Sequence, residues 1–174
     1  MKTLIFGASM GSFGALAVFL SFTFGWPGWV LFMAWVCSYL FGKSLKKSLN
    51  IYLQIVLGIV LGILIETLGQ FLSAVIGNMF GLYLAILLLI GSLAFSTKIK
   101  GLGDIAAWFI GLIVFFGAEP PLALVSVART LLLPLAAGFL FGYGLDTFLD
   151  KFVHGGSSVR STADEPLEAS TQKN

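Results

Sequence analysis

The stretch LGILIETLGQ, from Leu61 to Gln70, places one carboxylate inside an otherwise apolar run that extends from Leu53 to Ile76. A run of this length is typical of a membrane-spanning helix, which needs roughly 20 apolar residues. An ionised side chain at such depth costs several kcal/mol unless it is paired or neutralised. Glu66 therefore predicts a polar interaction in the interior of a helical membrane protein.

The composition favours the same class. Of the 174 residues, 58% are hydrophobic and only 10% are charged, and the mean hydropathy is +1.00. No soluble domain of this length could bury that much apolar surface, so the lipid bilayer is the expected main partner. The net charge of +2 is too small to favour nucleic acid. The single cysteine, Cys37, excludes an intrachain disulfide and a cysteine metal cluster, and no cofactor is expected.

Six apolar segments predict six membrane-spanning helices. They are Thr3–Phe24, Pro27–Gly42, Leu49–Ile76, Phe80–Thr97, Ile105–Gly117 and Leu122–Leu145. Glycine, proline and asparagine mark the joints at Gly25–Gly28, Gly77–Asn78, Gly101–Asp104 and Glu119–Pro121. The predicted fold is all-α, a bundle of six transmembrane helices over residues 1–154. The polar residues 155–174 are expected to form a disordered cytoplasmic tail, with His154 solvated at its root.

Basic residues orient this bundle. Lys2 precedes the first segment, and six further lysines follow the even segments: Lys43, Lys46 and Lys47, then Lys98 and Lys100, then Lys151. The intervening turns carry no lysine or arginine. Because basic loops stay on the cytoplasmic side of the membrane, both termini are predicted to be cytoplasmic.

Glycines share helix faces in three segments. They are Gly7, Gly11 and Gly14 in the first, Gly58, Gly62 and Gly69 in the third, and Gly138 and Gly142 in the last. Small residues let helices approach closely in lipid, so these glycines predict helix packing, including packing between copies in a homo-oligomer. The alternative is that they widen a path for a solute.

Glu66 lies about 80° around the third segment from Gly58, with Gln70 near 120° and Gln54 near −40°, so its carboxylate is expected to point along this stripe of small and polar residues into the bundle. Arg129, the one basic residue within a predicted span, lies about 12 Å below the outer turn, against about 16 Å for Glu66. Two interpretations follow. In one, Glu66 and Arg129 form an ion pair that fixes the third segment against the sixth. In the other, these four polar residues line a solute path.

Two segments, Pro27–Lys47 and Leu131–Leu145, resemble corresponding parts of the YcdZ-like family of small bacterial inner-membrane proteins. The most specific shared element is Leu133-Pro134 followed by Gly138 and Phe141-Gly142-Tyr143. The similarity covers about Gly7 to Leu145, together with the length and the six apolar segments. It implies a multi-pass protein of the bacterial inner membrane and no particular activity, because that family is a domain of unknown function.

Three classes of function are compatible with a helical membrane protein of this kind. An enzyme is not expected, because the sequence has no histidine cluster, no carboxylate pair at metal spacing and no nucleophile motif. A channel or transporter for a small polar solute is the leading interpretation, since Glu66, Gln54, Gln70 and Arg129 supply interior polarity. The alternative is a non-transport accessory or structural protein that packs against another membrane complex through its glycine faces.

Overall fold

The computed structural model describes residues 2–41 and 44–152, and within these ranges every regular element is a helix. The elements are α1 (Lys2–Phe24), α2 (Gly28–Phe41), α3 (Leu45–Ile76), α4 (Asn78–Ser96), α5 (Ile105–Ala118), α6 (Leu124–Val127), η1 (Ala128–Leu132) and α7 (Leu133–Phe152). The all-α prediction is confirmed for these residues. Lys43, His154 and the predicted tail at 155–174 lie outside them.

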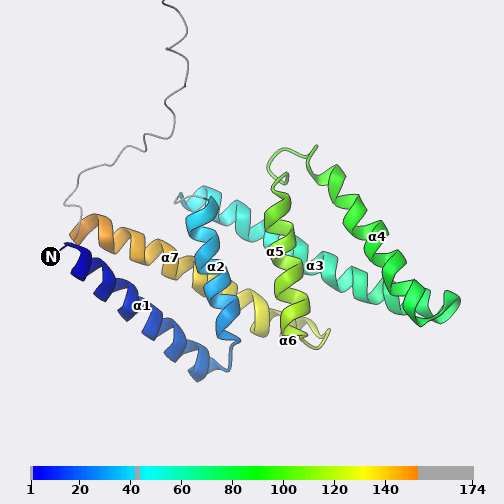
Figure 1. Cartoon of the computed structure of the whole chain (residues 1–174), viewed down its shortest axis with the longest axis horizontal. Helices are drawn as coiled ribbons and strands as arrows, with labels where there is room; N and C mark the ends of the chain where they lie inside the picture. Colours follow the sequence, from blue (N-terminus) through cyan, green and yellow to red (C-terminus); the bar gives the residue numbers. More distant parts are fainter. Residues whose placement is uncertain (1, 42–43, 153–174) are drawn as a thin grey trace, which may run out of the picture.

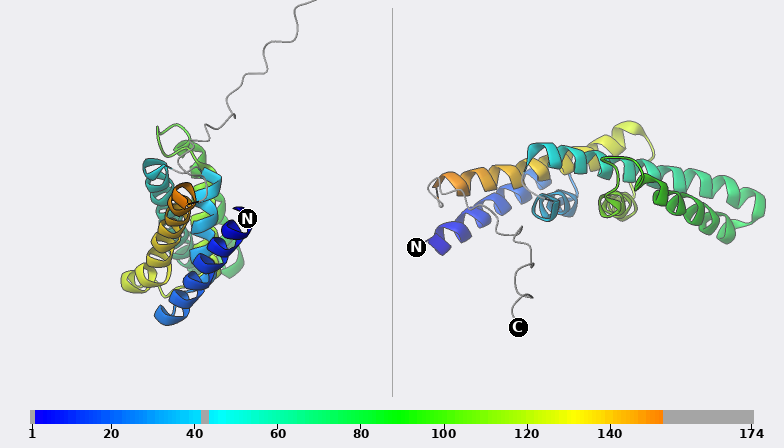
Figure 2. Two further views of the ribbon diagram at one scale, coloured as in Figure 1. Left: turned by 90° about the vertical axis from the view of Figure 1, so that its left-hand side faces the viewer. Right: turned by 90° about the horizontal axis from the view of Figure 1, so that it is seen from above.

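The helices run back and forth between two sides of the molecule (Figure 1). The ends of α2 and α4 and the starts of α3 and α5 lie on the upper side of that view, whereas the opposite ends of these helices lie below. From above, α2 and α5 are seen nearly along their axes, while α1, α3, α4 and α7 run across the view (Figure 2). The two short helices therefore stand upright among long, inclined ones.

Helix contacts are closest where two backbones meet at a glycine. A Cβ on Gly58 of α3 would collide with the backbone carbonyl oxygen of Trp108 in α5, and one on Gly111 of α5 with the carbonyl of Ile55. The contact between α2 and α7 is similar, because a Cβ on Gly138 would meet the carbonyl oxygen of Leu31. Backbones this close gain dispersion and weak hydrogen bonds that a bulkier side chain would prevent.

The remaining glycines of α3 and α7 lie at contacts too. Gly62 faces the ring of Phe115, Gly69 faces Leu82 of α4, and Gly142 faces Ser38 of α2. On α1 the outcome differs, since nothing lies within 4 Å of a Cβ added at Gly7, Gly11 or Gly14. Within the described part of the chain these three glycines thus meet no other helix, and their packing against a partner helix stays a prediction. The physical reason is that α1 touches α2 and α7 through other residues, among them Ala17 and Phe13.

Two helix boundaries differ from the predicted ones by more than two residues. The third helix begins at Leu45, four residues before Leu49, because Ser44 caps it by accepting a hydrogen bond from the backbone N–H of Lys47 at 3.2 Å. The last helix continues past Leu145 to Phe152. Leu145 and Leu149 are buried against α1 and α2, and this packing extends the helix.

The continuous helical segment formed by α6, η1 and α7 contains one irregular turn. Residues Ala128–Leu132 form a π-helix between α6 and α7 that ends two residues before the buried Pro134. Proline lacks the N–H that would bond the carbonyl four residues earlier, and a wider turn accommodates that loss. The hydroxyl of Tyr52 donates to the carbonyl oxygen of Leu132 at 3.1 Å, which joins α3 to the end of this turn.

Three of the helical rods are long and apolar enough to cross a membrane: Thr3–Phe24, Leu45–Ile76 and Leu124–Lys151. The other three, Gly28–Phe41, Phe80–Ser96 and Ile105–Ala118, are apolar but shorter. The long rods indicate a membrane protein.

The glycine contacts can be tested by a matched pair of substitutions. Gly111→Ala places a methyl group against the Ile55 carbonyl, and we expect a net loss of about 1–3 kcal/mol of stability, typical of overpacking. Gly11→Ala meets open space, so it should keep or slightly raise stability through better helix propensity. Thermal unfolding in detergent measures both. Equal melting temperatures for the two variants would contradict the α3–α5 contact.

Candidate functional site

Gln54 is buried in α3, with only 1% of its surface exposed, and its amide is bonded on both sides. Its Nε2 donates to Oδ1 of Asn50 at 2.8 Å, and its Oε1 accepts from the backbone N–H of Asp104 at 2.9 Å. Asp104 is the residue before the first turn of α5. The Gln54 side chain therefore satisfies a backbone donor at the start of α5.

Two further side-chain hydrogen bonds hold the loop between α4 and α5 near Gln54. Asn50 Nδ2 donates to the carbonyl of Gly101 at 2.8 Å, and Trp108 Nε1 donates to the carbonyl of Leu102 at 3.0 Å. With Gln54, these bonds fasten the loop to α3 and to the first turns of α5. Gly101, at φ 90°, adopts a conformation that side chains disfavour.

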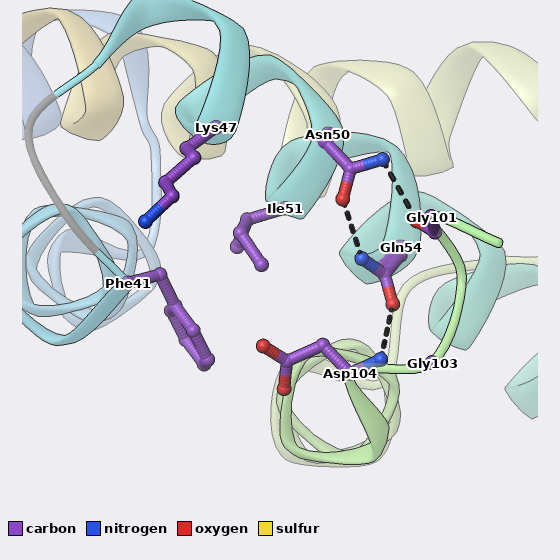
Figure 3. A pocket seen from close by; sticks show the side chains of 8 residues that line it. All are labelled: Phe41, Lys47, Asn50, Ile51, Gln54, Gly101, Gly103 and Asp104. Carbon is purple, nitrogen blue, oxygen red and sulfur yellow. Dashed lines mark hydrogen bonds between the residues drawn. The ribbon is translucent and has the colours of Figure 1, made fainter. Parts of the chain in front are cut away.

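A cavity of about 300 Å³ opens beside this loop (Figure 3). We call it the upper cavity; it is lined by Phe41, Lys47, Asn50, Ile51, Gln54, Gly101, Gly103 and Asp104. Figure 3 shows the Lys47 side chain reaching into the opening from above and the Asp104 carboxylate from below, with the Phe41 ring beside the carboxylate. The end of α2, the first turns of α3 and the residue before α5 thus bring together one aromatic ring, one cation and one anion.

A second cavity of about 300 Å³, the lower cavity, lies at the other end of α5. It is lined by Glu66, Leu82, Phe115, Phe116, Glu119 and Pro120. Glu66 is partly buried and accepts a hydrogen bond from Gln70 Nε2 at 3.3 Å, while Gln70 itself is exposed. Glu119, with φ 44°, ends α5 in the left-handed conformation. Two carboxylates and two aromatic rings give this cavity a negative, partly apolar lining.

The contact of α3 with α5 separates the two cavities. The upper cavity uses Gln54 of α3 and Asp104 before α5, and the lower one uses Glu66 of α3 and Glu119 after α5. Between them, the α3–α5 contact is closed by the Gly58–Gly111 approach and by the Phe115 ring on Gly62. On α3, Gln54 and Glu66 are about 18 Å apart along the helix axis.

Arg129 lies elsewhere, exposed in the π-turn η1. In the described ranges 2–41 and 44–152 the structure records no ion pair between Glu66 and Arg129. The four predicted polar residues are therefore divided: Gln54 lines the upper cavity, Glu66 the lower one with Gln70 bonded to it, and Arg129 neither cavity. An interaction between Glu66 and Arg129 stays a prediction.

Sequence reasoning missed Asn50, Asp104 and Glu119 as partners of the predicted residues. Asn50 lies four residues before Gln54, which puts the two amides on one helix face, and this spacing was a usable signal. In the sequence Asp104 and Glu119 stand only in turns, and their nearness to α3 depends on how α5 packs. The described residues hold no group of three or more histidine, cysteine or acidic side chains suited to a metal ion.

Comparison with known families gives one match. Residues 8–149 match the model of a family described as a protein of unknown function, DUF1097. No match was found among curated proteins or among solved structures. The YcdZ-like name stays a resemblance.

The bonds of Gln54 predict a local and a global effect. Gln54→Leu leaves the Asp104 N–H without its acceptor, and we expect a loss of about 1–3 kcal/mol of stability together with faster tryptic cleavage after Lys98 and Lys100. Gln70→Leu changes an exposed side chain of the same helix and serves as the control. If both variants resist trypsin equally, the Gln54 bonds do not hold the loop.

A double-mutant cycle tests the predicted ion pair. Because Arg129 is exposed and Glu66 is bonded to Gln70, we expect the losses for Glu66→Gln and Arg129→Gln to add within about 0.5 kcal/mol. The stability of the two single variants and the double variant, measured in detergent, gives the coupling energy. A double variant that is clearly more stable than the sum of the two single losses predicts would show that Glu66 and Arg129 form an ion pair.

Proposed function

The chain belongs to the DUF1097 family of proteins of unknown function, and we propose that it is a transporter for a small polar solute in the bacterial inner membrane. The observation that supports this proposal is the pair of polar cavities at opposite ends of the α3–α5 contact. Charged and amide side chains are costly near lipid, and those that occur there commonly mark solute paths. A closed contact between two cavities favours a transporter over an open channel.

A six-span topology accompanies this proposal. A 14-residue helix such as α2 or α5 is about 21 Å long, and the 32-residue α3 is about 48 Å long, against a hydrocarbon core of about 30 Å. With the membrane normal along the upright α2 and α5, the long helices are strongly inclined (Figure 2). Inclined long helices and local thinning of the bilayer together accommodate both lengths.

The charges support one orientation in the membrane. Lys46 and Lys47 at the start of α3 and Lys98 and Lys100 after α4 belong to helix ends on the upper side of Figure 1, and Lys151 belongs to the higher end of the inclined α7. By the positive-inside rule this side is cytoplasmic, as are both termini. The upper cavity would then open to the cytoplasm and the lower cavity to the outside.

Transport by this arrangement needs the two cavities to connect in turn. Sliding or tilting α5 against α3 at the Gly58–Gly111 contact would join one cavity to the interior while the other stays closed. Glycine backbones carry no interlocking side chains, so this contact resists such a movement less than a packed one. The Glu66 and Glu119 carboxylates would attract the cationic group of a solute or a proton at the outer opening.

The alternative, a non-transport accessory protein, rests on a different observation. The face of α1 that carries Gly7, Gly11 and Gly14 is open, and most of α1 is exposed. Small residues on an exposed membrane helix suit a close partner helix, either of another complex or of a second copy. Neither function is enzymatic.

Accessibility of single cysteines tests the topology and the two openings. In a Cys37→Ala background, Lys47→Cys should react with a membrane-impermeant maleimide only in inverted vesicles, and Glu119→Cys only in spheroplasts. Both side chains line the cavities and are exposed at their openings. Labelling of both positions from the same side would contradict the six-span arrangement.

Uptake by liposomes containing the purified full chain tests transport itself. We expect faster entry of some small polar solute than in empty liposomes, and a change of about tenfold in rate for Glu66→Gln, equivalent to about 1.4 kcal/mol. Thr67→Val, an exposed position one residue away on α3, is the control and should leave the rate unchanged. No uptake across a broad panel of solutes would favour the accessory role.

A further inference from the structure

Some polar side chains of the upper cavity have hydrogen-bond partners within the protein, and others have none that the structure records among the described residues. Asn50 and Gln54 are engaged with each other and with the loop at Gly101 and Asp104. The Asp104 carboxylate makes no capping hydrogen bond to the first turn of α5, although an aspartate in this position usually does. Instead the carboxylate is directed into the cavity (Figure 3).

Lys47 faces the same opening from α3. Throughout residues 2–41 and 44–152, the structure records no ion pair between Lys47 and Asp104 and no side-chain hydrogen bond for either charged group. Opposite charges held apart across a cavity are complementary to a ligand that carries both charges in the reverse order. The ring of Phe41, which also lines the cavity, adds a surface on which an ammonium group can lie.

We propose that the upper cavity binds a compact zwitterion, with the ligand's ammonium group at Asp104 and Phe41 and its anionic group at Lys47. The volume of about 300 Å³ is at the small end of ligand pockets, which limits the ligand to a few heavy atoms beyond its charged groups. A free amino acid and a phosphatidylethanolamine headgroup both present this chemistry. The inference rests on the proposed function only in identifying this cavity as the cytoplasmic opening of the solute path.

Binding to the purified full chain in detergent tests the site without requiring transport. The probes are alanine, as a free solute, and phosphoethanolamine, as the headgroup; acetate and ethylammonium carry one charge each and serve as controls. We expect one of the zwitterions to raise the melting temperature at concentrations where neither single charge does. Asp104→Asn and Lys47→Gln should each weaken that binding by about tenfold or more.

Two matched variants keep the test specific. Lys46→Gln removes a neighbouring charge that does not line the cavity and should bind as the unmodified chain does. Asp104→Asn keeps the size of the side chain and the backbone N–H bonded to Gln54, so the fold should persist. Binding of alanine supports a solute site, and binding of phosphoethanolamine alone supports a lipid-headgroup site.

The proposal is overturned if neither zwitterion binds, or if Asp104→Asn and Lys47→Gln bind as tightly as the unmodified chain. Equal binding of acetate or ethylammonium alone would also overturn it, because one charge would then suffice. Liposome uptake of alanine separates this result from the function proposed above. Alanine that binds through both charges but is not taken up would leave the site in place and remove its role in transport.

Discussion

The close approach of glycine backbones is the constraint on which the rest of the structure depends. Helices in lipid gain little from hiding apolar side chains, since the lipid tails are equally apolar. The contact of α3 with α5 therefore depends on dispersion between the two backbones, which approach closely at Gly58 and Gly111. That closeness brings the start of α5 within reach of Gln54 and the end of α5 within reach of Glu66, so both cavities are consequences of one helix contact.

The polar residues of α3 serve two different purposes. Near the start of α3, the amides of Gln54 and Asn50 form hydrogen bonds that hold the loop before α5. The charged groups of Lys47 and Asp104 beside them line the upper cavity. Toward its lower end, Glu66 keeps one local bond, to Gln70, and shares a cavity with a second carboxylate. One helix thus carries structural amides at its upper end and an available carboxylate about 18 Å farther along its axis.

The sequence was sufficient for the helices and for most of their ends, since apolar runs separated by glycine and proline turns leave few alternatives. It was insufficient for the partners of the polar residues. Depth along a helix suggested that Arg129 could reach Glu66, but depth says nothing about the direction in which a helix faces. Glycine stripes were likewise visible in α1, α3 and α7, yet only packing decides that Gly58 meets a backbone and Gly11 meets open space.

The π-turn in the last rod has a consequence for the register of side chains. Val127, Leu131, Leu135 and Phe139 recur every four residues and all belong to one buried cluster. In a regular α-helix each step of four residues drifts by about 40° around the axis, so the last of them would turn away from the first. The wider turn at Ala128–Leu132 offsets part of this drift. One extra residue in the helix therefore acts as a spacer that keeps a four-residue repeat on a single face.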